Sequence, residues 1–131
     1  MRAVILMRGF AFGGIERYVL SIIEGLGRRG VSWEVWHPNP EFVSSILGRL
    51  DASIRALGRV VETDVTHGGR GFWTHFRTAW RGFRAIREPF VVFMNESSPG
   101  MFAAAGLAGW LAGARRIVNV THWISDVHER R

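Results

Sequence analysis

Short apolar runs alternate with longer segments of helical period along this chain, and that alternation most restricts its fold. The first run, AVILM at residues 3–7, is followed by apolar residues at helical spacing from Ile15 to Leu26. Nearly continuous apolar runs are typical of strands buried on both faces of a parallel sheet. The alternation predicts an α/β protein: a Rossmann-like three-layer sandwich with a mainly parallel sheet of about five strands.

The boundaries of these elements follow from caps and breakers. We expect strands at residues 2–7, 31–37, 59–63, 90–94 and 116–120. Asn39 followed by Pro40 predicts the start of a helix that continues to Leu57, although Gly48 weakens its middle. Further helices are expected after the first strand as far as Gly30, over residues 72–88 ahead of Pro89, and from Ser98-Pro99 to Gly113.

Length and composition bound the class of protein. The 131 residues suit one domain, and the absence of cysteine excludes disulfides and thiolate metal sites. All basic residues are arginine, and the net charge of +6 favours anionic partners. The longest apolar stretch, residues 101–114, is shorter than the ~20 residues of a membrane span. With no targeting segment evident, we expect a cytoplasmic protein.

Polar residues gather where the predicted strands end, which is where open α/β sheets bind ligands. They include Asn95, Glu96 and Ser97 after the fourth strand, and His37, His67 and His122 after three others. These histidines could in principle share a metal. Their separation carries no ligand-spacing signature, so we expect no metal site.

The turn after the first strand contains Gly13 and Gly14, with Glu16 in the following helical turn. Unpaired N–H groups at a helix start favour an anion, and glycines let the backbone approach a diphosphate closely. The spacing differs from G-x-G-x-x-G, and there is no Walker lysine. Two interpretations stay open: the glycines only make the turn, with Glu16 complementing the helix dipole, or they also bind phosphate.

The predicted helix around residues 70–87 combines aromatic side chains with arginines. Phe72, Phe76, Trp80 and Phe83 form a stripe. One interpretation is an interfacial helix on anionic lipid, at the inner face of the membrane. The other is a stripe packed on the sheet with a solvated arginine face. The candidate membrane-facing residues are Trp73, Arg77, Trp80, Arg81 and Arg84.

These segments together resemble the N-terminal, acceptor-side domain of family-four retaining glycosyltransferases with the GT-B fold. The resemblance rests on GGIERYVLSIIEGLGRRG after the first strand, FVVFMNESS at the fourth and RIVNVTHW at the fifth. It implies a catalytic His122 beside the transferring sugar and Gly13 and Gly14 near the donor diphosphate. Asn95 to Ser98 would border the acceptor pocket.

The resemblance also implies a function for the chain. It predicts transfer of a sugar from a nucleotide-sugar donor to a saccharide or lipid-linked acceptor, with retention. The nucleotide-sugar is a substrate, so no cofactor is expected. The family's C-terminal donor-binding domain is absent from these 131 residues, so we expect the chain alone to be inactive or nearly so.

Two alternatives from other classes stay open. The chain could be a stand-alone nucleotide- or phosphate-binding module without catalysis, or a peripheral membrane protein that acts through the helix at 70–87. Nucleic-acid binding is not expected, because the arginines are spread around an α/β pattern without a recognised reading motif.

Overall fold

The computed structural model describes residues 1–7, 14–65, 71–95 and 99–119. Five strands form one parallel sheet in the order β3-β2-β1-β4-β5, which confirms the predicted fold class. The elements follow each other as β1 (Arg2–Met7), α1 (Gly14–Arg28), β2 (Ser32–His37), α2 (Pro40–Leu47), α3 (Ala52–Arg55), β3 (Gly58–Glu62), α4 (Phe72–Arg84), β4 (Phe90–Asn95), α5 (Pro99–Leu111) and β5 (Ile117–Asn119).

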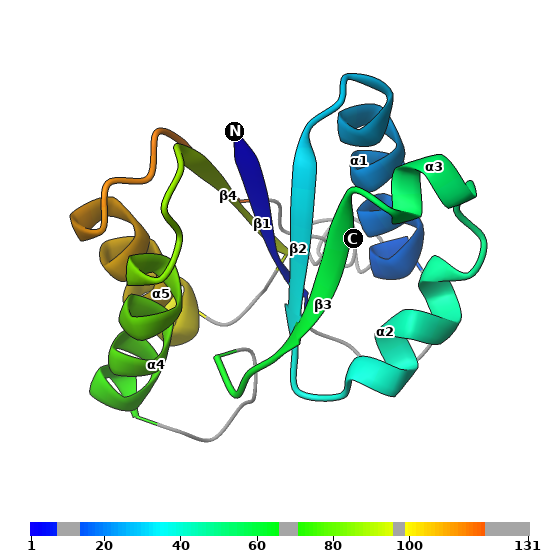
Figure 1. Cartoon of the computed structure of the whole chain (residues 1–131). Helices are drawn as coiled ribbons and strands as arrows, with labels where there is room; N and C mark the ends of the chain where they lie inside the picture. Colours follow the sequence, from blue (N-terminus) through cyan, green and yellow to red (C-terminus); the bar gives the residue numbers. More distant parts are fainter. Residues whose placement is uncertain (8–13, 66–70, 96–98, 120–131) are drawn as a thin grey trace, which may run out of the picture.

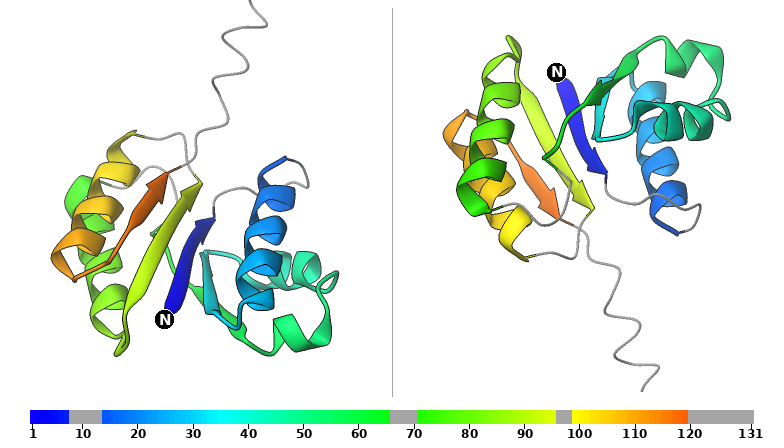
Figure 2. Two further views of the ribbon diagram at one scale, coloured as in Figure 1. Left: turned by 90° about the horizontal axis from the view of Figure 1, so that it is seen from above. Right: turned by 90° about the horizontal axis from the view of Figure 1, so that it is seen from below.

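Helices cover both faces of the sheet and make three layers. α1, α2 and α3 lie on one face, while α4 and α5 lie on the other (Figures 1 and 2). β1 serves both cores: Ala3, Ile5 and Met7 pack toward the first set of helices, and Val4 and Leu6 toward the second. All five of these residues are buried, which explains the unbroken apolar run in the sequence.

The helix predicted from Pro40 to Leu57 is wrong in its continuity, because the chain forms two helices there. The predicted start holds, since the Asn39 side chain accepts a hydrogen bond from the N–H of Phe42. α2 ends at Leu47, with Gly48 as its C-cap, and α3 begins after Asp51. The break lets α3 turn toward the sheet, where the Trp33 indole donates to the Ile54 carbonyl at 3.1 Å.

The helix predicted over 72–88 begins as expected at Phe72 but ends at Arg84, four residues early. Its last turn tightens, with the N–H of Ala85 donating to the Gly82 carbonyl and that of Ile86 to the Phe83 carbonyl. The remaining residues, 85–89, connect the helix to β4, which lies between β1 and β5. The predicted ends of the other helices hold at Gly30 and Gly113, both with positive φ.

α4 packs closely on the sheet at Gly82. A Cβ added to Gly82 would overlap the Trp36 indole of β2. Phe83, one residue further on, stacks on Trp36 with 4.8 Å between ring centroids and on Phe90 with 5.5 Å. Glycine at position 82 therefore sets the distance between this helix and the sheet.

Candidate functional site

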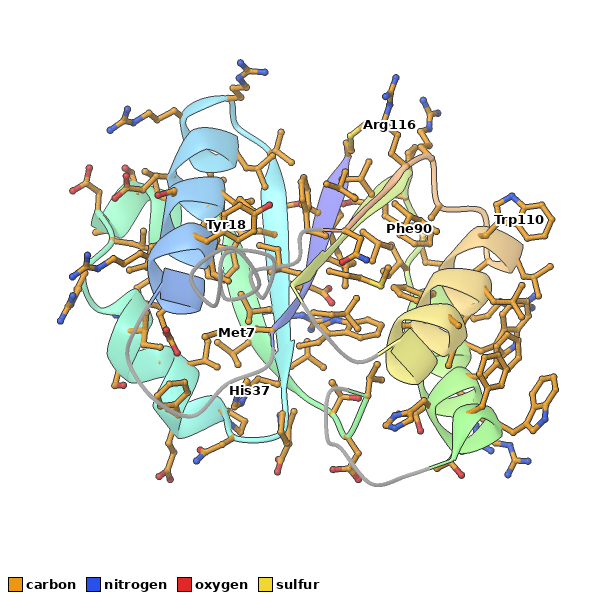
Figure 3. The ribbon with its side chains drawn as sticks, turned by 180° about the vertical axis from the view of Figure 1, so that it is seen from behind. Met7, Tyr18, His37, Phe90, Trp110 and Arg116 are labelled. Carbon is orange, nitrogen blue, oxygen red and sulfur yellow. The ribbon has the colours of Figure 1, made fainter. Side chains whose placement is uncertain are left out.

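The carboxyl ends of the four longer strands meet at one edge of the sheet. Met7 of β1 is the register partner of Asn95 of β4, and His37 of β2 is the partner of Glu62 of β3. Figure 3 shows Met7 and His37 toward this edge and Phe90 and Arg116 toward the opposite one. After β1 the chain adds β2 and β3 on one side, then crosses to add β4 on the other. The edge between β1 and β4 is therefore a topological switch point, where open α/β sheets bind ligands.

The N-terminus of α1 lies beyond the end of β1 at this edge. Gly14 is the first residue of the helix, and Glu16 lies in its first turn with only 2% of its surface exposed. The dipole of a 15-residue helix favours negative charge at that position. The first turn also has N–H groups without partners in the helix. A helix start of this kind can offer N–H donors to an anion.

The described residues include only part of the site predicted from the sequence. Gly14, Glu16 and the backbone of Asn95 lie at the expected edge. The catalytic candidate His122 lies outside the described residues, as do Gly13, Glu96 and Ser97. Their predicted roles stay predictions.

His37 has structural contacts of its own. Its side chain is fully buried, and its Nδ1 accepts a hydrogen bond from the N–H of Asn39 at 2.8 Å. Its ring lies 5.5 Å from that of Phe42. These contacts hold the turn between β2 and α2. His67 and His122 are not described, and the described residues contain no group of three potential metal ligands placed to bind an ion.

His75 was not singled out from the sequence as a functional candidate. It lies in the first part of α4, the end that faces the same edge, and is 4% exposed. Its Nδ1 is buried, and no group among the described residues forms a hydrogen bond with it. His75, Ala79 and Phe83 are the buried residues of α4, and the sequence does not distinguish this side of the helix from the more apolar side through Phe76 and Trp80. Of the predicted aromatic stripe, only Phe83 lies on this face, while Phe72, Phe76 and Trp80 are half-buried beside it.

The membrane-facing candidates lie on the outer side of α4. Trp73 is 67% exposed, and Arg77, Arg81 and Arg84 are exposed as well. Trp80 is half-buried, with the Arg84 guanidinium 5.3 Å from its ring centroid. This distance is within the range of a cation–π contact.

The other end of the sheet contains a buried carboxylate. Glu34 is 4% exposed and accepts hydrogen bonds from Arg2 at 2.6 Å, from Arg59 at 3.3 Å and from the Trp36 indole at 3.1 Å. Glu34 and the two arginines border a cavity of about 230 Å³. The two arginines compensate the carboxylate, so this cluster is an ion pair network at the amino edge, remote from the switch point.

The fold and its switch-point edge define a class: a doubly wound α/β protein of Rossmann-like architecture. Neither a family model nor a curated protein matches the sequence. Within the described part of the chain, none of the helices is both long and apolar enough to span a bilayer.

Proposed function

We propose that this chain forms the acceptor-side half of a retaining glycosyltransferase that uses a nucleotide-sugar donor. The observation that carries the proposal is the switch point between β1 and β4, with α1 beginning just beyond it. A helix N-terminus at such a crevice favours a phosphate-bearing ligand. The choice of a sugar nucleotide rests on the resemblance of the glycine turn and of the strand-five segment to this family.

Each candidate residue has a role in the proposed reaction. Gly13 and Gly14 let the backbone approach the donor diphosphate, and Glu16, in the first turn of α1, is a further binding candidate at the same turn. Asn95, Glu96 and Ser97 border the acceptor, and His122 contacts the transferring sugar. By the same resemblance, a second Rossmann-like domain holds most of the donor. The proposal places the reaction in the cytoplasm.

Binding at the glycine turn is tested by titrating the chain with a nucleoside diphosphate in a calorimeter. Gly14→Val should abolish the heat, because a branched side chain at the helix start occupies the space that the phosphates need. Gly25→Val is the matched control, since a Cβ at Gly25 in the same helix meets no atom within 4 Å. Equal binding by both variants would exclude the glycine turn as the phosphate site.

Transfer is tested in the polypeptide that the source cell makes, with a labelled nucleotide-sugar and analysis of the anomeric configuration of the product. His122→Ala should lower kcat by about 10²- to 10⁴-fold, the usual contribution of a group that takes part in proton transfer. His128→Ala, which changes another histidine of the same C-terminal segment with no role in the proposed reaction, is the control and should leave kcat unchanged. Unchanged turnover would remove His122 from the mechanism. Nucleotide binding without transfer to any acceptor would favour the stand-alone binding module instead.

A further inference from the structure

The outer surface of α4 and α5 exposes large apolar side chains. We call this surface the aromatic face. It consists of the exposed Trp73 of α4 and Trp110 and Leu111 of α5, together with Phe76 and Trp80 of α4, which are half-buried and also pack against the core. Trp73 and Trp110 are each 67% exposed, and Leu111 is 51% exposed. Figure 3 shows Trp110 pointing away from the body of the protein. A group of exposed side chains of this size marks an interaction surface.

The aromatic rings on α4 contact one another in a row along the helix. The centroid of Trp73 lies 5.6 Å from that of Phe76 in an edge-to-face contact, and Phe76 stacks on Trp80 at 6.1 Å. Arg84 lies over Trp80 at the end of the row. These contacts fix the rings on the surface, so they can enter an apolar phase without further ordering of the helix.

The charge on the two helices that form the aromatic face is of one sign, and the exposed Glu88 lies just beyond the end of α4. The sequence has no carboxylate between positions 71 and 87 or between positions 99 and 119. Arg77, Arg81 and Arg84 are exposed on α4, and Arg115 and Arg116 are exposed after α5. Exposed tryptophan with arginine and no acidic residue is complementary to a bilayer that contains anionic lipid. A second copy of the chain would bring two positive surfaces together.

The exposed side chains of the two helices, Trp73 on α4 and Trp110 with Leu111 on α5, lie at opposite ends of the aromatic face. α4 and α5 both begin near the carboxyl edge of the sheet and end near the amino edge, because each follows one parallel strand and precedes the next. Trp73 lies in the first turn of α4, whereas Trp110 and Leu111 lie in the last turn of α5. A flat surface can meet both ends only when the helix axes lie parallel to it.

From this geometry we propose that the aromatic face docks the protein on a bilayer containing anionic lipid, with α4 and α5 lying flat on it. In this orientation the strands run along the membrane plane, and the edge between β1 and β4 opens sideways, with the layer of α4 and α5 (Figure 2) between the sheet and the bilayer. Docking in this orientation requires the α5 anchor, Trp110 and Leu111, as much as it requires Trp73. The docking does not rest on the proposed transferase activity.

The test is co-sedimentation of the complete chain with vesicles of phosphatidylcholine alone or mixed with phosphatidylglycerol. Binding should require phosphatidylglycerol. Trp73→Ala and Trp110→Ala should each lower the partition coefficient roughly tenfold, through the apolar area they no longer bury. A variant with Arg77, Arg81 and Arg84 changed to Glu should lower it by on the order of 100-fold or more, at about a factor of five per arginine and further for the reversed charge.

The matched control carries the same change of charge on the other layer, with Glu in place of the exposed Arg28, Arg29 and Arg55. It should bind vesicles far better than the α4 variant, and thermal melting should show that both are folded. Equal loss in the two variants would overturn the proposal in favour of a net-charge effect. Equal binding to neutral vesicles or unchanged binding by Trp110→Ala would also overturn the proposal. A protein that binds no vesicle but forms a dimer in solution, and whose dimer dissociates in Trp73→Ala, would overturn it in favour of self-association.

Discussion

Replacing Glu34 by glutamine or by leucine separates its charge from its hydrogen bond to Trp36. Glutamine keeps an acceptor for the indole N–H and removes the charge that faces Arg2 at 2.6 Å and Arg59 at 3.3 Å. Leucine removes both. The two variants therefore measure two contributions to stability at one buried position.

The contacts set the expected magnitudes. A hydrogen bond to a charged group contributes about 1.5–3 kcal/mol and a neutral one about 0.5–1.5 kcal/mol, so Glu34→Gln should cost about 1–2 kcal/mol. The loss stays moderate because the Arg59 side chain is 71% exposed and Arg2 keeps an ion pair with Glu88 at 3.2 Å. Glu34→Leu also leaves the buried Trp36 N–H without this acceptor, which raises the cost to about 2–4 kcal/mol.

Urea unfolding followed by circular dichroism measures the free energies. Thermal unfolding of the same variants should show a loss in Tm of roughly 4 °C for each kcal/mol. Arg59→Gln is the control and should change the free energy of unfolding by less than about 0.5 kcal/mol, as exposed ion pairs usually do. A Leu variant as stable as the native protein would refute the reasoning, because apolar packing would then outweigh the network. Equal losses for Gln and Leu would show that the Trp36 hydrogen bond contributes nothing.

Three further predictions test other parts of the fold. Gly82→Ala should lower the free energy of unfolding by about 1–3 kcal/mol, because its Cβ overlaps Trp36, whereas Gly25→Ala in open space should not lower it; urea unfolding compares them. His75→Leu removes a buried Nδ1 for which the described residues supply no partner, so stability should be unchanged or rise by about 1 kcal/mol; a clear loss in the same assay would mean that the imidazole has a partner. Burial raises the pKa of Tyr18 above its ordinary value of 10.0, so the unfolded chain ionises first and stability should fall as the pH rises above 10; absorbance titration of this single tyrosine checks it, and a midpoint at or below that value would contradict it.

The sequence predicted every strand because each has a strong local signal. The run at 2–7 is unbroken because β1 is buried on both faces, and the Asn39-Pro40 pair marks the start of α2 by capping chemistry that acts within four residues. The sheet order was not predicted, since it depends on contacts between residues distant in sequence. The continuous helix to Leu57 failed for the same reason: the bond from Trp33 to Ile54, which accompanies the turn into α3, joins residues far apart in the chain.

For the candidate site, the sequence could predict only its location at the carboxyl edge of the sheet. Gly14, Glu16 and Asn95 were placed at this edge correctly, because each lies close to the carboxyl end of a predicted strand. The burial of the Glu16 and His75 side chains could not be predicted, because it depends on which side of each helix faces the sheet. The buried side of α4 contains His75 and Ala79, whereas the adjacent and more apolar side, with Phe76 and Trp80, is only half-buried. The α5 anchor was missed because an Ala- and Gly-rich helix shows little amphipathic contrast.

The distribution of tryptophan has a spectroscopic consequence. Trp33 and Trp36 are 2% exposed in the sheet, whereas Trp73 and Trp110 are mostly exposed on the outer helices. Unfolding would bring the first pair into water and shift their fluorescence emission to longer wavelengths. Entry of the second pair into an apolar phase would shift their emission to shorter wavelengths. Loss of structure and surface binding therefore change the intrinsic emission of this protein in opposite directions, without any added label.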